Sequence, residues 1–423
     1  MQSTKFLIVG GGITSLSFAA ALEESDYLVI EALSDVGGHC QTVKQDGFVW
    51  DYSGHFFHFR HPEIERQLVD RIGAHRVRTV EKQSKIFFAD DWVDFPFQKN
   101  IHQLPRDHFL DCLVDLFERP QTEPSNFYEM LHAKFGRGIS ERFLVPYNEK
   151  LYATDLRRLD VDAMGRFFPH ADVPSIIRGF RHSDNQSYNA TFTYPEGGAI
   201  EYVRAIQQDV ISDKIALNER VERIDLQSKV ATTNLRQLRF EYLVSAAPFP
   251  KLLQMCQLPF ERHVYGYNKV LVFNLGFNAK GPSNVHWIYY PQRDLCFYRV
   301  GFYDNIFDTS RMSLYVELGY PADAALDEQT IETLRTRGLE DLRRARVLTS
   351  QQLVAHHHVV LDPAYVHITR ASLDDVRDKK ATLATRGVYS IGRYGSWTYC
   401  SIEDNILEAR ALAARFNAVA ACP

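Results

Sequence analysis

A run of three glycines between an apolar segment and a segment of small residues constrains this chain more than any other feature. Residues 5–9 read as a buried strand, residues 10–12 are Gly-Gly-Gly, and residues 13–22 place small and apolar side chains at helical spacing. A second strand over residues 27–30 ends on Glu31. Strand, glycine turn, helix, strand and acid, in this order, are the pattern of a dinucleotide-binding βαβ unit. The pattern predicts a Rossmann-like domain in the N-terminal part of the chain.

Each residue of this pattern has a physical task. Gly10 permits the tight turn, and Gly12 lets the backbone approach a pyrophosphate at the free N–H groups of the helix N-terminus. Ser15 stands where the pattern has its third glycine and is small enough for close packing of helix on strand. Glu31 follows Gly12 by nineteen residues, where its carboxylate can accept hydrogen bonds from a ribose with a free 2′-OH. We expect these four residues to hold a dinucleotide.

A second glycine pair, Gly37 and Gly38, follows the acid-bearing strand in the segment SDVGGHCQT. A single βαβ unit that binds NAD does not require such a pair. Here the sequence resembles the large flavoprotein class that includes amine oxidases, protoporphyrinogen oxidase and UDP-galactopyranose mutase. In that class the pair lets the chain run close to the flavin side of FAD, so the resemblance implies FAD as the cofactor.

The rest of the chain predicts one interrupted domain better than it predicts separate domains in a row. Residues 61–75 and 101–145 predict helices with several breaks in the helical pattern. Residues 215–240 predict strands, and the alternation of aromatic and β-branched residues over 265–320 predicts an antiparallel sheet. The resemblance implies that the apolar strand 242–247 returns to the FAD sheet.

If the chain formed separate domains in a row, the last strand over 388–393 and the helix over 402–414 would have no partner. We expect an α/β fold in which a doubly wound parallel sheet forms a Rossmann-like FAD-binding domain, with a helical insertion and an antiparallel β-sheet substrate domain. The expected boundaries are 1–90 for the first part of the FAD domain, 91–185 for the helical insertion, 186–250 for the return to the FAD domain, 251–375 for the antiparallel sheet and 376–423 for the closing strand and helix.

Further segments narrow the resemblance to the UDP-galactopyranose mutases. They are, in order, DYSGHFFHF (51–59), DFPF (94–97), YNEKLY (147–152), FYRVGF (297–302) and RYGSWTY (393–399). They resemble the YGxHxFHT, LPF, YTEKQW, YTRIIE and RxxxYxY segments of these mutases and keep their order over nearly the full length. The resemblance implies that reduced flavin N5 attacks the anomeric carbon of a nucleotide-sugar, expels the nucleoside diphosphate, and lets the pyranose and furanose rings interconvert.

The same resemblance implies the catalytic and cofactor residues. Arg299 and Arg393 stand at the two matching arginine positions and would hold the diphosphate, because the planar guanidinium pairs bidentately with phosphate oxygens. An ordinary salt bridge is the alternative for each of them. His55 lies on the loop expected against the isoalloxazine ring, and Gly392 and Arg393 are expected to contact the FAD.

The substrate side departs from the mutases. Tyr147, Tyr152 and Tyr399 fall where the mutases hold the base, sugar and phosphates, with core packing as the alternative for Tyr147 and Tyr152. Arg166 keeps one of two positive charges that the mutases carry after the YTEKQW helix, and Lys269 is a loose match to another arginine. These departures favour a nucleotide-sugar other than UDP-galactopyranose.

Composition excludes other classes. With 48 Lys and Arg against 53 Asp and Glu, the formal charge of −5 creates no global field that would attract nucleic acid. The six cysteines lie far apart, and the glycine-interrupted segment 6–22 fits neither a signal peptide nor a membrane span, so we expect a soluble cytoplasmic protein without a transmembrane segment. His356–His358 would alternate across a strand and cannot share one ion, so no metal site is expected. The oligomeric state stays open.

Two other function classes remain open. A flavin oxidase or desaturase of the amine oxidase and protoporphyrinogen oxidase type would use the same FAD domain with an aromatic, apolar pocket. It would not require Arg299 and Arg393. A non-catalytic FAD-binding or interaction protein is the other class.

Overall fold

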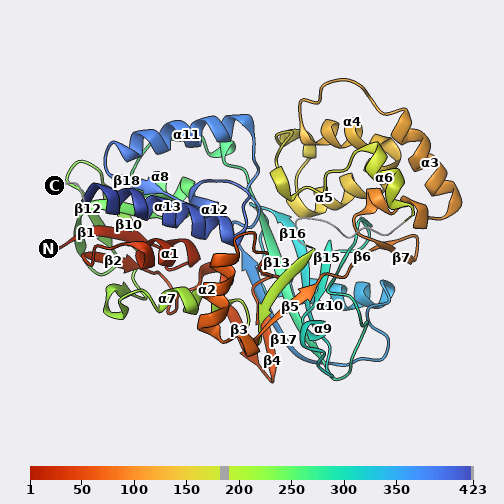
Figure 1. Ribbon diagram of the computed structural model, residues 1–423, viewed down its shortest axis with the longest axis horizontal. Coiled ribbons are helices and arrows are strands. Elements are labelled where there is room, and N and C mark those ends of the chain that lie inside the picture. The colour runs from red at the N-terminus through yellow and green to blue at the C-terminus, as the bar shows by residue number, and fades with distance from the viewer. Residues whose placement is uncertain (182–189, 421–423) are drawn as a thin grey trace.

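In a computed structural model, which describes residues 1–181 and 190–420, the chain builds two seven-stranded sheets, one largely parallel and one largely antiparallel (Figure 1). The expected boundary at residues 185 and 186 lies outside the described residues, as does Cys422. Within the described residues, no helix is both long enough and apolar enough to cross a membrane.

The largely parallel sheet has the order β10-β11-β12-β1-β2-β9, and β18 also pairs with β12. Its strands are β1 (Gln2–Val9), β2 (Tyr27–Ile30), β9 (Ile215–Ala216), β10 (Val221–Asp225), β11 (Val230–Thr233), β12 (Gln237–Ser245) and β18 (Val388–Ser390). β1 pairs in parallel with both neighbours, so that Val9 lies beside Ile30 and Ser245. The carboxyl ends of three strands therefore meet at one edge, and the predicted return of the strand at 242–247 to this sheet is confirmed.

Helices pack around this sheet. They are α1 (Ile13–Ala21), α2 (Pro62–Ile72), α7 (Ile200–Gln207), α8 (Phe249–Met255), α11 (Arg370–Ala384), α12 (Gly392–Gly395) and α13 (Ile402–Ala420). α1 and α13 lie side by side in Figure 1 and are in contact. The helix predicted over 402–414 is longer than expected. The strand predicted over 388–393 is shorter, because Gly392, with a φ of 84°, starts the helical turn α12.

The largely antiparallel sheet has the order β17-β13-β16-β15-β14-β6-β7. Its strands are β6 (Ser84–Phe88), β7 (Asp91–Asp94), β13 (Asn268–Phe277), β14 (Trp287–Tyr289), β15 (Arg299–Phe302), β16 (Ser313–Pro321) and β17 (Leu353–Leu361). β6 and β7 lie on either side of the boundary expected at residue 90, yet both belong to this sheet. The reason is that β6 pairs in parallel with β14 and so extends the sheet at that side.

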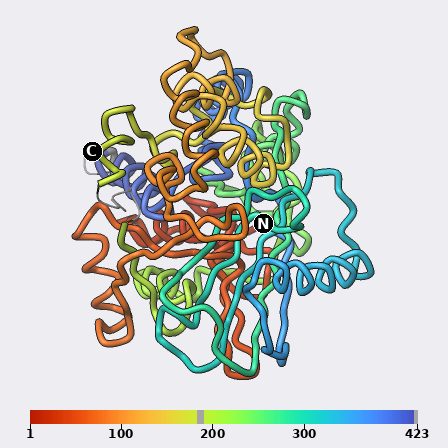
Figure 2. Tube along the Cα trace, turned by 90° about the vertical axis from the view of Figure 1, so that its right-hand side faces the viewer, coloured from red at the N-terminus to blue at the C-terminus, as the bar shows by residue number. Residues whose placement is uncertain are grey.

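The segment between the sheets is helical, with α3 (Arg106–Phe117), α4 (Phe127–Ile139), α5 (Val145–Tyr152) and α6 (Val173–Gly179). The helical stretch predicted over 101–145 is broken between α3 and α4, where Pro120 and Pro124 cannot continue a helix. A π-helical turn, Ser140–Leu144, joins α4 to α5. In Figure 2 this orange-to-yellow region forms the top of the molecule.

Smaller elements complete the fold. They are the β3 (Thr42–Gln45) and β4 (Phe48–Asp51) hairpin, the antiparallel pair of β5 (Val77–Glu81) and β8 (Thr191–Pro195), and the helices α9 (Asp304–Phe307) and α10 (Glu328–Arg344). The predicted fold class, an FAD-type α/β domain with helical and antiparallel-sheet insertions, is confirmed.

Candidate active site

A cavity of about 1030 Å³ lies between the carboxyl edge of β1 and β2 and the strands β14, β15 and β16. Open α/β sheets bind ligands at this edge. A pocket for one small ligand measures roughly 300–1,000 Å³, so this cavity has room for more than a small substrate.

Backbone forms one end of the cavity. Gly10, with a φ of 99°, turns the chain out of β1, and Gly12 caps α1 with nothing within 4 Å of the position of a Cβ. Gly37 and Gly38 both have positive φ, and the Gly37 N–H donates to the Gly11 carbonyl at 2.9 Å. The two glycine segments thus lie against each other and present peptide groups, rather than side chains, to the cavity.

Glu31 lines this end of the cavity and is 8% exposed. Its carboxylate accepts hydrogen bonds from the N–H groups of Gly11 at 2.5 Å and of Leu33 at 2.8 Å, which fix its orientation. Ser15 is fully buried behind the turn and does not line the cavity. It contributes close packing of α1 and no contact with the cavity.

His39 and His55, both half-buried, line the cavity beyond the glycines. Burial lowers the pKa of His55 to about 3, with smaller contributions from His39 and the arginines, and its Nδ1 is buried without a hydrogen bond to any described residue. Burial and the charge of Arg393 lower the pKa of His39 to about 4. Both rings are therefore neutral near pH 7. His39 was missed by the sequence analysis, although its place directly after the glycine pair was a signal.

Arg299 reaches the cavity already paired with a carboxylate. It stands opposite Glu317 in the β15–β16 ladder, and its Nε and Nη2 donate to the two carboxylate oxygens at 2.7 and 2.8 Å. The Glu317 side chain is 1% exposed and also accepts from the Ser53 hydroxyl. Burial opposes the charge of Arg299, but Glu317 offsets this effect and the pKa of Arg299 is well above its usual value. Glu317 was missed, although an acid within the apolar run LYVEL was a visible anomaly.

Arg393 reaches the same cavity without a carboxylate. No acid of the described residues lies within 4.0 Å of its guanidinium, and its Nε is buried without a hydrogen bond to them. Among the described residues, its other guanidinium nitrogens make only long bonds, Nη1 at 3.5 Å to the Cys400 carbonyl and Nη2 at 3.4 Å to the Ala364 carbonyl. Gly392, which precedes it, does not line the cavity but packs closely against Thr14 of α1.

Tyrosines surround Arg393 and continue along the wall. The guanidinium lies 4.7 Å from the ring centre of Tyr399 and 5.3 Å from that of Tyr365. Burial opposes its charge, but the tyrosines raise the pKa of Arg393 overall, so it stays charged. Burial raises the pKa of Tyr399 and of Tyr289 to about 12, so their hydroxyls are protonated and can donate. The Tyr298 hydroxyl is buried in this wall without a partner among the described residues.

The family model described as flavin containing amine oxidoreductase matches residues 16–416. The chain belongs to this family. Among solved structures, its fold is similar to that of reduced UDP-galactopyranose mutase, with a TM-score of 0.89 and 23% identity over 99% of this chain and 95% of the other. It is also similar to a provisionally assigned protoporphyrinogen oxidase from Exiguobacterium sp. 255-15 (TM-score 0.78, 16% identity, 98% and 99% covered) and to cyclohexylamine oxidase from Brevibacterium oxydans IH-35A (0.68, 16%, 97% and 98%). At these identities the likeness shows the fold.

The protein is thus an FAD-dependent enzyme of the amine oxidoreductase family, and the predicted cofactor and flavoprotein class are confirmed. The residues fit FAD. The open α1 N-terminus at Gly12 suits a pyrophosphate, and Glu31 is placed for a ribose. The cavity then continues from the glycines to His55 and the arginines, where a flavin ring would lie.

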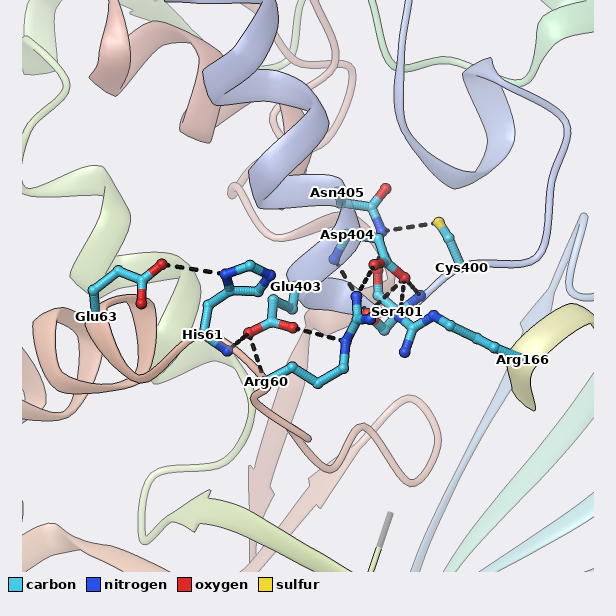
Figure 3. A network of polar contacts seen from close by, with 9 residues as sticks. All are labelled: Arg60, His61, Glu63, Arg166, Cys400, Ser401, Glu403, Asp404 and Asn405. Atoms are coloured by element: carbon cyan, nitrogen blue, oxygen red, sulfur yellow. Dashed lines mark hydrogen bonds and ion pairs between the residues drawn. The ribbon is translucent and has the colours of Figure 1, made fainter. Parts of the chain in front are cut away.

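Arg166, which the sequence predicts to bind the substrate, does not line the cavity. Figure 3 shows its side chain reaching from the helical region to the start of α13, where its Nη2 lies 2.5 Å from Asp404 Oδ2 and 3.3 Å from Ser401 Oγ. Arg60 binds the other oxygen of Asp404 at 3.0 Å. The charge of Arg166 is therefore used in a junction between the helical region and α13, while the next residue, Phe167, lines the cavity.

Tyr147, Tyr152 and Lys269 also lie behind the cavity wall. The Tyr147 ring packs on Tyr289, with ring centres 5.2 Å apart. Tyr152 is 1% exposed, and the Lys269 ammonium lies 3.6 Å from Asp362. Both tyrosine rings thus pack behind the wall, and their assignment to the substrate stays a prediction.

Lys150 explains this arrangement of the YNEKLY segment. Its ammonium donates to the carbonyls of Tyr290 at 3.0 Å, of Gln292 at 2.8 Å and of Phe297. Next to it, Glu149 forms an ion pair with Arg293 at 2.5 Å. The motif thus fastens α5 to the β14–β15 connection, which leads directly into Arg299.

Proposed function

We propose that this flavoprotein is a nucleotide-sugar mutase that interconverts pyranose and furanose rings. Its substrate can be a nucleotide-sugar other than UDP-galactopyranose. The observation that carries the proposal is Arg393, a cation with no carboxylate of the described residues within 4.0 Å, which faces the same cavity as Arg299 and His55. An apolar or amine substrate has no use for such a group. The similarity in fold to reduced UDP-galactopyranose mutase supports the same reading.

Reduced FAD supplies a nucleophile, its N5, toward the anomeric carbon of the sugar. The chain must hold the diphosphate while its bond to the sugar breaks and forms again. Arg393 can do so, because its buried Nε and its weakly bonded Nη atoms are available to phosphate oxygens. Preorganised donors of this kind stabilise the charge that develops on the leaving group.

Other wall residues position the substrate. Arg299 is held rigidly by Glu317, so it offers its remaining N–H groups in one fixed direction. The protonated hydroxyls of Tyr298, Tyr289 and Tyr399 can donate to sugar or phosphate oxygens. His55 stays neutral and adds no second charge beside Arg393.

The test is product analysis with the FAD-loaded protein. The flavin is reduced anaerobically with dithionite, a panel of nucleotide-sugars is added, and pyranose and furanose forms are separated by chromatography. We expect conversion of at least one sugar by the reduced protein and none by the oxidised protein. Arg393→Gln with full FAD content is the matched variant and should convert the sugar about 10³-fold less efficiently. Absence of conversion across the whole panel contradicts the proposal.

The aromatic wall favours a second candidate, an oxidase of the amine oxidase type. Phe56, Trp287 and Tyr289 line the cavity beside the histidines and suit an apolar substrate. An oxidase would be reduced by a panel of amines without dithionite and would release hydrogen peroxide in air. Its turnover should survive Arg393→Gln, which separates the two candidates.

A further inference from the structure

A second, smaller cavity of about 280 Å³ lies among α1, α2, α7 and α13. These four helices gather on the left of Figure 1 beside the parallel sheet. Among the described residues, the two cavities share no lining residue. The smaller cavity therefore has a chemistry separate from that of the FAD site.

Two arginines give this cavity a positive character. Arg71 of α2 is paired with Asp209 at 2.6 Å and also donates to the Ala205 carbonyl at 3.0 Å. Arg410 of α13 donates to Gln67 Oε1 at 2.6 Å, and no acid of the described residues lies within 4.0 Å of it. Among the described residues that line this cavity, one acid, Asp209, therefore stands against two cations.

Electrostatics agrees with this geometry. Burial and the charge of Arg71 lower the pKa of Arg410, while the more distant acids Asp209 and Glu63 raise it by less. The positive charge of Arg71 thus disfavours the charge of Arg410. An anion placed between them would relieve that repulsion.

A buried hydroxyl provides an independent sign of a missing partner. Ser17 of α1 lines the cavity, is 2% exposed, and has an Oγ without a hydrogen bond to any described residue. Buried polar groups are nearly always bonded, and an exception points to a water or an ion. Ala20 and Ala21 of the same helix leave room there, because their methyl groups do not fill the cavity.

We propose that this cavity binds a small oxyanion of the phosphate class, either as the free ion or as the phosphate end of a small ester. Arg410 supplies its planar guanidinium, Arg71 adds a second positive charge, and the Ser17 hydroxyl donates a hydrogen bond. Guanidinium groups match phosphate oxygens in geometry as well as charge. The site stands whether or not the proposed mutase reaction is correct.

The test is calorimetric titration of the FAD-loaded protein with inorganic phosphate, with chloride at equal ionic strength as the blank. Arg410→Gln and Ser17→Ala should each raise the phosphate Kd by about tenfold, as expected for loss of a hydrogen bond to a charged group. The matched control is Arg415→Gln, an exposed arginine on the same helix, which should leave the Kd unchanged. Visible absorbance of bound FAD checks folding, and Ser17→Ala keeps the test decisive if Arg410→Gln does not fold.

The outcomes separate the possibilities. A parallel titration with glycerol phosphate distinguishes an ester site from a site for the free ion, and saturable binding of either one supports the proposal. No saturable binding to the unaltered protein means that water fills the cavity and overturns it. Equal affinity in the unaltered protein, Arg410→Gln and Ser17→Ala would place the anion elsewhere and also overturn it.

Discussion

Arg299 and Arg393 face one cavity from two differently built regions. Arg299 comes from the antiparallel sheet and is bound at 2.7 and 2.8 Å by Glu317, its neighbour across the ladder. Arg393 comes from the turn after β18, where tyrosine rings and two distant carbonyls surround it and no carboxylate of the described residues is within 4.0 Å. The antiparallel sheet therefore supplies Arg299, whose position is fixed and whose charge is balanced by Glu317. The turn after β18 supplies Arg393, which gives the cavity wall its net positive charge.

The difference shows how one site can combine rigidity with affinity for an anion. A buried ion pair fixes geometry, but its desolvation offsets much of the attraction that it would offer a ligand. A cation held among tyrosine rings keeps its charge through cation–π contacts and still lacks a strong acceptor. We expect substitutions in the two regions to affect different properties.

The largest expected effect separates the two arginines by activity. Arg393→Gln should lower kcat/KM of the proposed ring interconversion by about 10³-fold, the loss typical of a charged donor at a developing anion. The charge-neutral double change Arg299→Gln with Glu317→Gln should lower it by only about tenfold, because the net charge of the wall is preserved. Equal losses in the two variants would show that the arginines are equivalent.

The second effect concerns stability. Glu317→Gln leaves the Arg299 charge without its counter-ion and should lower the free energy of unfolding by about 3 kcal/mol, measured by urea denaturation of the FAD-loaded protein. The double change Arg299→Gln with Glu317→Gln should recover most of this loss. A double variant less stable than the single variant would mean that hydrogen bonding, rather than charge, dominates the pair.

The third effect uses the neighbouring histidines as probes of charge. The pKa values of His55 and His39 are lowered to about 3 and about 4, so the folded protein binds fewer protons than the unfolded chain between about pH 3 and pH 6.5. Their contribution to stability is present above pH 6.5 and is lost as the pH falls through this window. Arg393→Gln should raise both pKa values and reduce the loss by on the order of 1 kcal/mol.

The matched measurement is the pH dependence of the urea midpoint in Arg393→Gln and in the double Arg299→Gln, Glu317→Gln variant. Arg393 lowers the pKa of His55 more than Arg299 does, so the first variant should change the profile more. If the urea midpoint depends on pH in the same way in the two variants, Arg393 does not supply the net charge that acts on the histidines.

The smallest effect is expected at Arg166, whose charge is used by Asp404 outside the cavity. Arg166→Gln should change kcat/KM by less than about threefold and stability by about 0.5 kcal/mol, since the pair is partly exposed to solvent. Steady-state kinetics and urea denaturation measure both. A loss of activity near that of Arg393→Gln would show that Arg166 reaches the substrate during turnover.

The cofactor end of the site could be predicted because its constraints act within short stretches of chain. A positive φ at Gly10 and Gly37, and open space at Gly12, are demands on single residues that only glycine meets easily. The predicted strand, turn and helix at residues 5–22 occur in the structure with small shifts at their ends.

The substrate end could be predicted only in part. Arg299, Arg393, His55 and Tyr399 do line the cavity, whereas Tyr147 and Tyr152 do not. Which face of α5 points inward depends on how the helix docks. That docking is decided by the Lys150 bonds to three carbonyls and by Gly319, where a Cβ would meet the Lys150 carbonyl oxygen.

The sequence by itself determined the βαβ unit, the two glycine turns at the cofactor end of the cavity and the class of cofactor. The reason is that backbone conformation and local hydrogen bonding are set by neighbouring residues. Only the tertiary structure decided which charged side chains face the cavity without a nearby counter-ion. Glu317 meets Arg299 because β15 and β16 pair in one particular register, and Arg166 meets Asp404 because the helical region approaches α13. Electrostatic attraction acts through space, so the net charge of a site depends on contacts between residues that are distant along the chain.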